Sequence, residues 1–290
     1  MRTISATAAA FLGLWLSLAP AHAAQDRYFT ASDGVRLHYA EAGRGHLVVF
    51  VPGWTMPAWI FNAQLADLSR SYHVVAFDPR SQGSSDIAAS GHEPGRRGQD
   101  IAELLAQFGP DPVVLVGWSL GVLDSLAYVH NHGDARIAGL ILVDNSVGEN
   151  PPPSSEGAPP AERRRGRRVV VSRETSMRNF VRGMFARLMS PDYIERLTQS
   201  ALRTPPAAAA ALLAYPVPRS FWREAVYSTQ KPVLYIVRCG LAGQAGSLAA
   251  NDPAAESVIM SGVGHAMFVD EPERFDSLLY TFLQRRVWSR

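Results

Sequence analysis

One stretch of the chain decides the fold, and it reads Val113-Val114-Leu115-Val116-Gly117-Trp118-Ser119-Leu120-Gly121. Four consecutive apolar residues are typical of a short strand that is buried on both faces. The glycines two positions before and after Ser119 permit a tight turn, and residues 122–130 have the pattern of a following helix. We therefore predict a strand-to-helix turn that exposes the Ser119 hydroxyl at the end of the strand.

The bulk composition favours one α/β domain with an insertion. The chain has 290 residues and is 47% hydrophobic, which is enough to bury a substantial core. The formal net charge is only +2, so nothing in the charge balance indicates a nucleic-acid partner. The densest basic run, at 163–168, follows a loop rich in proline and serine, and we interpret it as a solvated loop or helix start rather than a polyanion site.

The first residues have the features of an export signal. Arg2 supplies a basic start, residues 8–18 are apolar, and Ala21-His22-Ala23 has the small-x-small pattern of a cleavage site. The apolar run is too short to cross a bilayer. We therefore expect a signal peptide over residues 1–23 with cleavage after Ala23, a secreted or periplasmic protein, and no stable membrane anchor after cleavage.

The rest of the chain alternates strand and helix patterns. Two strand-like runs flank Asp33-Gly34 and predict an opening β-hairpin. Amphipathic segments predict helices between the later strands, and the closing helix is expected over 275–287. Strands that alternate with helices pair in parallel through right-handed crossovers, so we predict an α/β fold with a doubly wound, mostly parallel sheet. Continuous apolar runs predict its buried strands at 47–51, 74–77, 113–117, 140–143, 233–237 and 257–260.

The alternation is interrupted in the second half of the chain. Proline-rich sequence at 151–160 opens a segment that is rich in arginine and alanine and has helical patterns. We therefore predict a first part of the core at 24–146, an inserted helical cap at 147–230 and the last part of the core at 231–290. The cap is expected to lie over the strand ends, where the Ser119 turn sits.

A serine hydroxyl becomes a good nucleophile only when a neighbouring base takes its proton, and His265 is the candidate base. It follows a predicted strand, and the nearby Gly262 and Gly264 allow its loop to bend back toward the carboxyl ends of the strands. None of the other seven histidines has a comparable setting. Acyl transfer also needs donors for the developing oxyanion, and the backbone N–H groups of Leu120 and Trp54 are the candidates.

Four motifs stand in order along the chain: Pro52-Gly53-Trp54, FDPRSQGSSD at 77–86, Gly117-Trp118-Ser119-Leu120-Gly121, and GHAMFVDEPERF at 264–275. In this order they resemble the α/β-hydrolase fold superfamily, and most of all its branch of capped esterases, haloperoxidases and proline-iminopeptidase-like enzymes. The resemblance covers about residues 27–290, with the cap poorly matched. Together the motifs are specific for the fold and not for a substrate.

The resemblance also implies an acid behind His265, and here the sequence departs from the family's pattern. The family's acid usually follows the strand before the histidine strand, but residues 238–244 hold no carboxylate at that position. Some members place the acid after the preceding core strand, which makes Asp144 the candidate. The alternatives are Asp252, no acid at all, or a purely capping role for Asp144. Cys239 is expected to be a buried structural thiol.

These residues predict a serine hydrolase that cleaves a carboxylic ester or lactone through an acyl-enzyme intermediate. The partner is a small-molecule substrate, and neither a metal nor an organic cofactor is expected, because no cluster in the sequence has ligand spacing. The same residues also suit an aminopeptidase acting after N-terminal proline or a cofactor-free perhydrolase, and the rival class is a non-catalytic binding module. An aminopeptidase should present cap acids to the substrate amine, and the cap offers Glu162, Glu174, Asp192, Glu195 and Glu224.

Overall fold

The computed structural model describes residues 24–149 and 171–288. The predicted signal peptide, the basic run at 163–168 and Glu162 lie outside the described residues.

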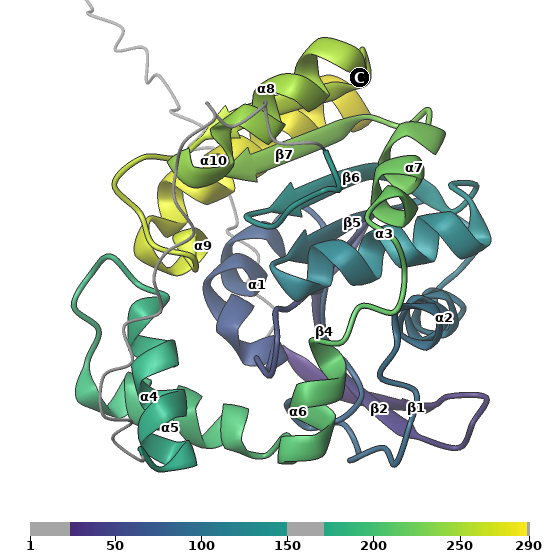
Figure 1. Ribbon diagram of the computed structural model, residues 1–290. Helices are drawn as coiled ribbons and strands as arrows, with labels where there is room; N and C mark the ends of the chain where they lie inside the picture. The colour runs from purple at the N-terminus through teal and green to yellow at the C-terminus, as the bar shows by residue number, and fades with distance from the viewer. Residues whose placement is uncertain (1–23, 150–170, 289–290) are drawn as a thin grey trace, which may run out of the picture.

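The described residues form an eight-stranded sheet (Figure 1). Its strands are β1 (Gln25–Thr30), β2 (Arg36–Gly43), β3 (Leu47–Val51), β4 (His73–Asp78), β5 (Val113–Trp118), β6 (Ile137–Val143), β7 (Val233–Val237) and β8 (Ala255–Ile259). The order across the sheet is β1-β2-β4-β3-β5-β6-β7-β8. The β1–β2 and β2–β4 pairs are antiparallel and every other pair is parallel, so the predicted fold class is confirmed.

Helices cover both faces of this sheet, as a doubly wound topology requires. The helices of the described residues are α1 (Asn62–Leu68), α2 (Pro94–Leu105), α3 (Leu120–His132), α4 (Arg173–Gly183), α5 (Pro191–Leu202), α6 (Pro206–Leu212), α7 (Ser220–Ser228), α8 (Ala242–Asn251), α9 (Met267–Asp270) and α10 (Pro272–Phe282). The closing helix therefore begins three residues earlier than predicted, at Pro272, and a π-helical turn over Leu283–Val287 follows it. A proline at the first helical position explains the earlier start, because its fixed φ suits that position.

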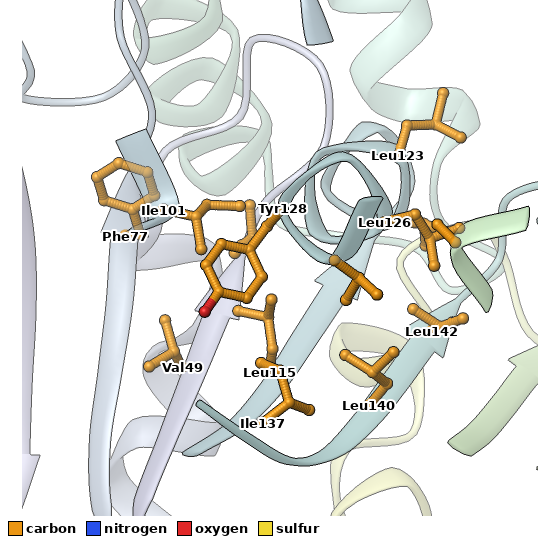
Figure 2. Packing of buried hydrophobic residues seen from close by; sticks show 14 of the residues in the cluster. Val49, Phe77, Ile101, Leu115, Leu123, Leu126, Tyr128, Ile137, Leu140 and Leu142 are labelled. Carbon is orange, nitrogen blue, oxygen red and sulfur yellow. The ribbon is translucent and has the colours of Figure 1, made fainter. Parts of the chain in front are cut away.

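Alternate residues of each buried strand enter two separate cores. Val49, Leu115 and Leu140 face a core that includes residues of α2, α3, α7 and α8, and Figure 2 shows this packing against Ile101 and Leu126. The intervening residues of the same strands, together with residues of α1, α4, α5, α9 and α10, form the second core. Because the strands are buried on both faces, they are continuous apolar runs, and β3 and β7 keep the bounds that those runs predict.

The described part of the predicted insertion contains four helices that pack in different places. α4 and α5 pack against each other, and their buried side chains join the second core. α7 instead packs against α3, so it belongs to the layer that covers the sheet (Figure 1). None of the helices in the described ranges is both long enough and apolar enough to span a membrane.

Asp276 is a buried carboxyl on α10 that accepts a hydrogen bond from Gln64 on α1 (Nε2 to Oδ1, 3.0 Å). Burial raises the pKa of Asp276 to about 6; the Gln64 hydrogen bond opposes this effect, and the charges of Asp67 and Glu273 add to it. Folding therefore favours the protonated form of Asp276 relative to the unfolded chain, in which the pKa of this carboxyl is lower.

A stability prediction follows from the sign of this shift. Because the pKa of Asp276 is higher in the folded than in the unfolded chain, its contribution to stability is greatest at low pH and is lost as the pH rises to about 6. Asp276→Asn should therefore stabilise the protein more at pH 7.5 than at pH 5.0, with a difference of about 1 kcal/mol in the free energy of unfolding. Urea denaturation at the two pH values measures this, and an equal effect at both would contradict it.

Candidate active site

Ser119 stands between β5 and α3 in a strained backbone conformation. Its φ of 55° and ψ of −120° lie in a region that residues with a side chain rarely occupy, at a cost of about 1–3 kcal/mol. Two hydrogen bonds hold it there: the Ser119 N–H donates to the carbonyl of Val143 (2.9 Å), and Asn145 Nδ2 donates to the carbonyl of Ser119 (2.8 Å). The predicted strand-to-helix turn is therefore present, and neighbouring β6 supports it.

The two glycines of the turn are required by close packing rather than by an unusual φ. Neither has a positive φ, but a Cβ on Gly117 would lie 2.3 Å from the carbonyl oxygen of Gly121. A Cβ on Gly121 would lie 2.1 Å from the carbonyl oxygen of Val51, at the end of β3. Both distances are too short for any side chain. The motif thus lets the first turn of α3 pass directly over the strand ends.

His265 lies between Ser119 and Asp144 and contacts both side chains. Its Nε2 is 2.8 Å from Ser119 Oγ, and its Nδ1 donates to Asp144 Oδ2 at 2.6 Å. The indole Nε1 of Trp118 donates to the backbone carbonyl of His265 (2.9 Å), which fixes the histidine loop to the end of β5. The structure therefore brings together the three side chains that the sequence singled out.

Asp144 follows β6 and is held by Arg238, which follows β7. The backbone N–H of Arg238 donates to Asp144 Oδ1 (3.0 Å), and its Nε donates to Oδ2 (2.5 Å). Burial raises the pKa of Asp144, but the hydrogen bonds from His265 and Arg238 outweigh burial and leave the pKa below its usual value. Asp144 is therefore an ionised carboxylate at neutral pH, as the partner of a histidine base must be.

The other carboxylate considered from the sequence, Asp252, lies elsewhere. It follows α8, and its Oδ1 accepts a hydrogen bond from the backbone N–H of Ala254 (2.9 Å). Within the described ranges Asp252 has no hydrogen bond to His265.

The loop after β3 brings Trp54 close to the serine. A Cβ on Gly53 would lie 2.9 Å from Ser119 Cβ, so only glycine allows this approach. The Trp54 indole donates to the carbonyl of Ala209 on α6 (2.7 Å), and its ring packs edge-on against Phe180 of α4. The backbone N–H groups of Trp54 and Leu120 have no acceptor in the part of the chain that the structure describes.

Sequence reasoning missed the residue that holds this loop, Gln82. Its Oε1 accepts from the N–H of Thr55 (2.7 Å), and its Nε2 donates to the carbonyl of Gly53 (3.3 Å). Gln82 is buried, and Thr55 adopts a left-handed φ of 60°. Its place inside the 77–86 motif was the available signal, but nothing local to that motif indicates that its side chain reaches the loop after β3.

The expectation that Cys239 is buried is wrong. β7 ends at Val237, and Cys239 begins a short 3₁₀ turn at the surface, where its thiol is exposed. Among residues 24–149 and 171–288, no group of three or more His, Cys, Asp or Glu side chains could hold a metal ion.

The chain belongs to the alpha/beta hydrolase family, whose sequence model matches residues 48–278. It is similar to a protein assigned as an aryl esterase from Burkholderia cenocepacia, with a TM-score of 0.77 and 26% identity over 92% of this chain and all of that one. An esterase from a Rhodococcus species aligns with a TM-score of 0.71 and 25% identity over 90% of this chain and 99% of that one.

A curated relative gives a match in sequence over a shorter stretch. A non-heme haloperoxidase of Rhodococcus erythropolis is 35% identical over 126 residues, which is 43% of this chain and 44% of that protein. The alignment therefore spans less than half of the relative. The esterase and haloperoxidase relatives support a hydrolase with the α/β fold.

The strain at Ser119 predicts that the glycine variant of this residue is more stable than the alanine variant. Both Ser119→Gly and Ser119→Ala remove the hydroxyl, but only glycine adopts the observed backbone angles without strain. Ser119→Gly should therefore exceed Ser119→Ala by about 1 kcal/mol in the free energy of unfolding, after allowing for the larger backbone entropy of glycine. Urea denaturation of the two variants measures the difference. If the alanine variant were equally stable or more stable, the conformation would not be strained.

Proposed function

We propose that this protein is an exported serine hydrolase that cleaves a carboxylic ester or lactone through an acyl-enzyme intermediate. The observation that carries the proposal is the continuous hydrogen-bonded series Ser119–His265–Asp144, with contacts of 2.8 and 2.6 Å. Export is proposed from the signal-peptide pattern of residues 1–23.

The proposed reaction has two halves, acylation of Ser119 and hydrolysis of the acyl-enzyme, and His265 acts first as base and then as acid in each. Ser119 Oγ transfers its proton to His265 Nε2 and attacks the carbonyl carbon, while the Asp144 carboxylate stabilises the imidazolium. The N–H groups of Trp54 and Leu120 hold the oxyanion. His265 then protonates the leaving alcohol oxygen, and the acyl group stays on Ser119. In the second half His265 takes a proton from water, the water oxygen attacks the acyl carbon, and His265 returns the proton to Ser119 Oγ as the bond from Oγ to the acyl group breaks and the acid leaves.

The surroundings of the serine favour an apolar or aromatic substrate group. Trp54 follows the glycine that touches Ser119, and its ring packs edge-on against Phe180 at a centroid distance of 5.2 Å. Aromatic side chains at this place supply apolar surface with defined geometry. The similarity to a protein assigned as an aryl esterase agrees with such a substrate class.

Arg178 makes the aminopeptidase alternative less suitable. Its guanidinium contacts the carboxylates of both Glu174 (2.6 Å) and Glu195, so two of the acids that could face a substrate amine are already paired. Glu162 lies outside the described residues.

Perhydrolysis is the second candidate, and the similarity to a non-heme haloperoxidase favours it. Hydrogen peroxide would replace water in the second half, so that the acyl group leaves Ser119 as a peracid and the serine hydroxyl is restored. The residues required are the same.

Labelling by a fluorophosphonate tests the nucleophile. The wild-type protein should be labelled at Ser119 and should hydrolyse p-nitrophenyl esters, whereas Ser119→Ala should show neither reaction. A prolyl p-nitroanilide in the same panel tests the aminopeptidase, and addition of hydrogen peroxide with detection of peracid tests perhydrolysis. Absence of labelling in well-folded wild-type protein would contradict the serine hydrolase and leave the non-catalytic binding module as the alternative.

Asp144→Asn tests the acid. An amide cannot stabilise the imidazolium and favours the wrong tautomer of His265, so ester turnover should fall by about 10³- to 10⁴-fold. Asp252→Asn is the matched control, because it neutralises the other carboxylate considered and leaves the series intact. Turnover of Asp144→Asn within a few-fold of the wild-type protein would exclude Asp144 as the acid.

A further inference from the structure

Asp270 is a fully buried carboxylate that the proposed mechanism does not use. It ends α9, five residues after His265, and its side chain accepts three backbone hydrogen bonds. Oδ2 accepts from the N–H groups of Gly264 (2.6 Å) and Ala186 (2.9 Å), and Oδ1 accepts from that of Arg187 (3.2 Å). A carboxylate buried with three donors around it is a strong anchor, because hydrogen bonds to a charged acceptor are stronger than neutral ones.

The three donors come from two segments that are far apart in sequence. Gly264 directly precedes His265, whereas Ala186 and Arg187 lie in the link between α4 and α5, residues 184–190. Arg187 also donates from Nη1 to the backbone carbonyl of Asp270 (2.6 Å). Asp270 therefore joins the α4–α5 link to the histidine loop through both its side chain and its main chain.

The two segments also touch each other directly. The N–H of Ala266 donates to the carbonyl of Met184 (2.9 Å). A Cβ on Gly264 would lie 2.3 Å from that same carbonyl oxygen and 2.7 Å from the backbone nitrogen of Ala186. Gly264 is thus the residue that lets the link lie against the histidine loop.

These contacts fix the backbone on both sides of His265. The N–H of Gly264 is held by Asp270, the carbonyl of His265 by Trp118, and the N–H of Ala266 by Met184. Of these three constraints, one comes from the end of β5 and two depend on the α4–α5 link and its anchor.

We propose that Asp270 is a positioning residue that fastens the α4–α5 link to the histidine loop, so that this end of the helical insertion and His265 are held as one unit. The part of this inference that concerns turnover rests on the proposed function; the coupling of the two segments does not. Loss of the anchor releases both segments, and the imidazole no longer keeps its place between Ser119 and Asp144.

Asp270→Asn is the variant that tests the anchor. An amide offers one acceptor oxygen and one NH₂ group, so at least one of the three N–H donors faces another donor and is left unpaired. Amide hydrogen exchange in the full-length protein should become at least about tenfold faster in both segments, residues 184–190 and 261–268. Turnover of p-nitrophenyl ester per site titrated by fluorophosphonate should fall by about 10²-fold, with KM changed only a few-fold, because a small displacement of the base affects the chemical step.

Asp276→Asn is the matched control. Asp276 is also a buried aspartate and stands six positions further along the chain. Its partner Gln64 also donates to the carbonyl of Phe268 (3.1 Å), but in the described ranges neither Asp276 nor Gln64 has a hydrogen bond to residues 261–266. Its exchange in residues 184–190 and 261–266 should not become faster, and its turnover per titrated site should equal that of the wild-type protein. A merely structural role of Asp270 would lower the number of titrated sites and leave turnover per site unchanged.

Arg187→Ala covers the case in which Asp270→Asn does not fold. It removes the bond from Nη1 to the Asp270 carbonyl and leaves the carboxylate in place, so exchange should rise in both segments by a smaller factor. Exchange that rises in the α4–α5 link alone, or in neither segment, would overturn the proposed coupling. If the wild-type protein is not labelled at Ser119, the proposed function fails, and the exchange results still decide the coupling.

Discussion

The close passage of the first turn of α3 over the end of β3 is the constraint on which the site depends. Gly121 packs on the carbonyl oxygen of Val51 with no room for a side chain, and Gly117 packs on Gly121 in the same way. This passage forces Ser119 into its strained φ of 55° and places it against Gly53 of the loop after β3. One contact between main chains therefore exposes the hydroxyl and brings the two backbone donors of the proposed oxyanion site to it.

The electrostatic part of the site depends on the pairing of β6 with β7. Val143 pairs with Ile236 in parallel register, so Asp144, one residue after Val143, and Arg238, two residues after Ile236, both emerge at the carboxyl ends of adjacent strands. Adjacent strands are only about 4.8 Å apart. An acidic residue at the end of either β6 or β7 can therefore reach the same histidine. In this chain the residue after β7 is Arg238, and it holds Asp144 through both a backbone and a side-chain hydrogen bond.

Residues of the predicted insertion make hydrogen bonds beside the candidate site at two places. Through the Trp54 indole, α6 is bonded to the loop that approaches Ser119. Through Asp270, the link between α4 and α5 is bonded to the loop that carries His265. α6 and the α4–α5 link thus contact the surroundings of Ser119 and His265, while α7 packs on α3 and belongs to the layer that covers the sheet.

The sequence by itself determined the elements whose signals are local. β3 and β7 were predictable to the residue because a strand buried on both faces must be continuously apolar, and Ser119 and His265 were predictable because glycines mark their turns. Only the tertiary structure decided which carboxylate meets His265, that Gln82 holds the loop after β3, that the Cys239 thiol is exposed and that Asp270 joins two distant segments. Those features depend on which strand ends and loops become neighbours, and neighbours in space leave no periodic pattern in the chain.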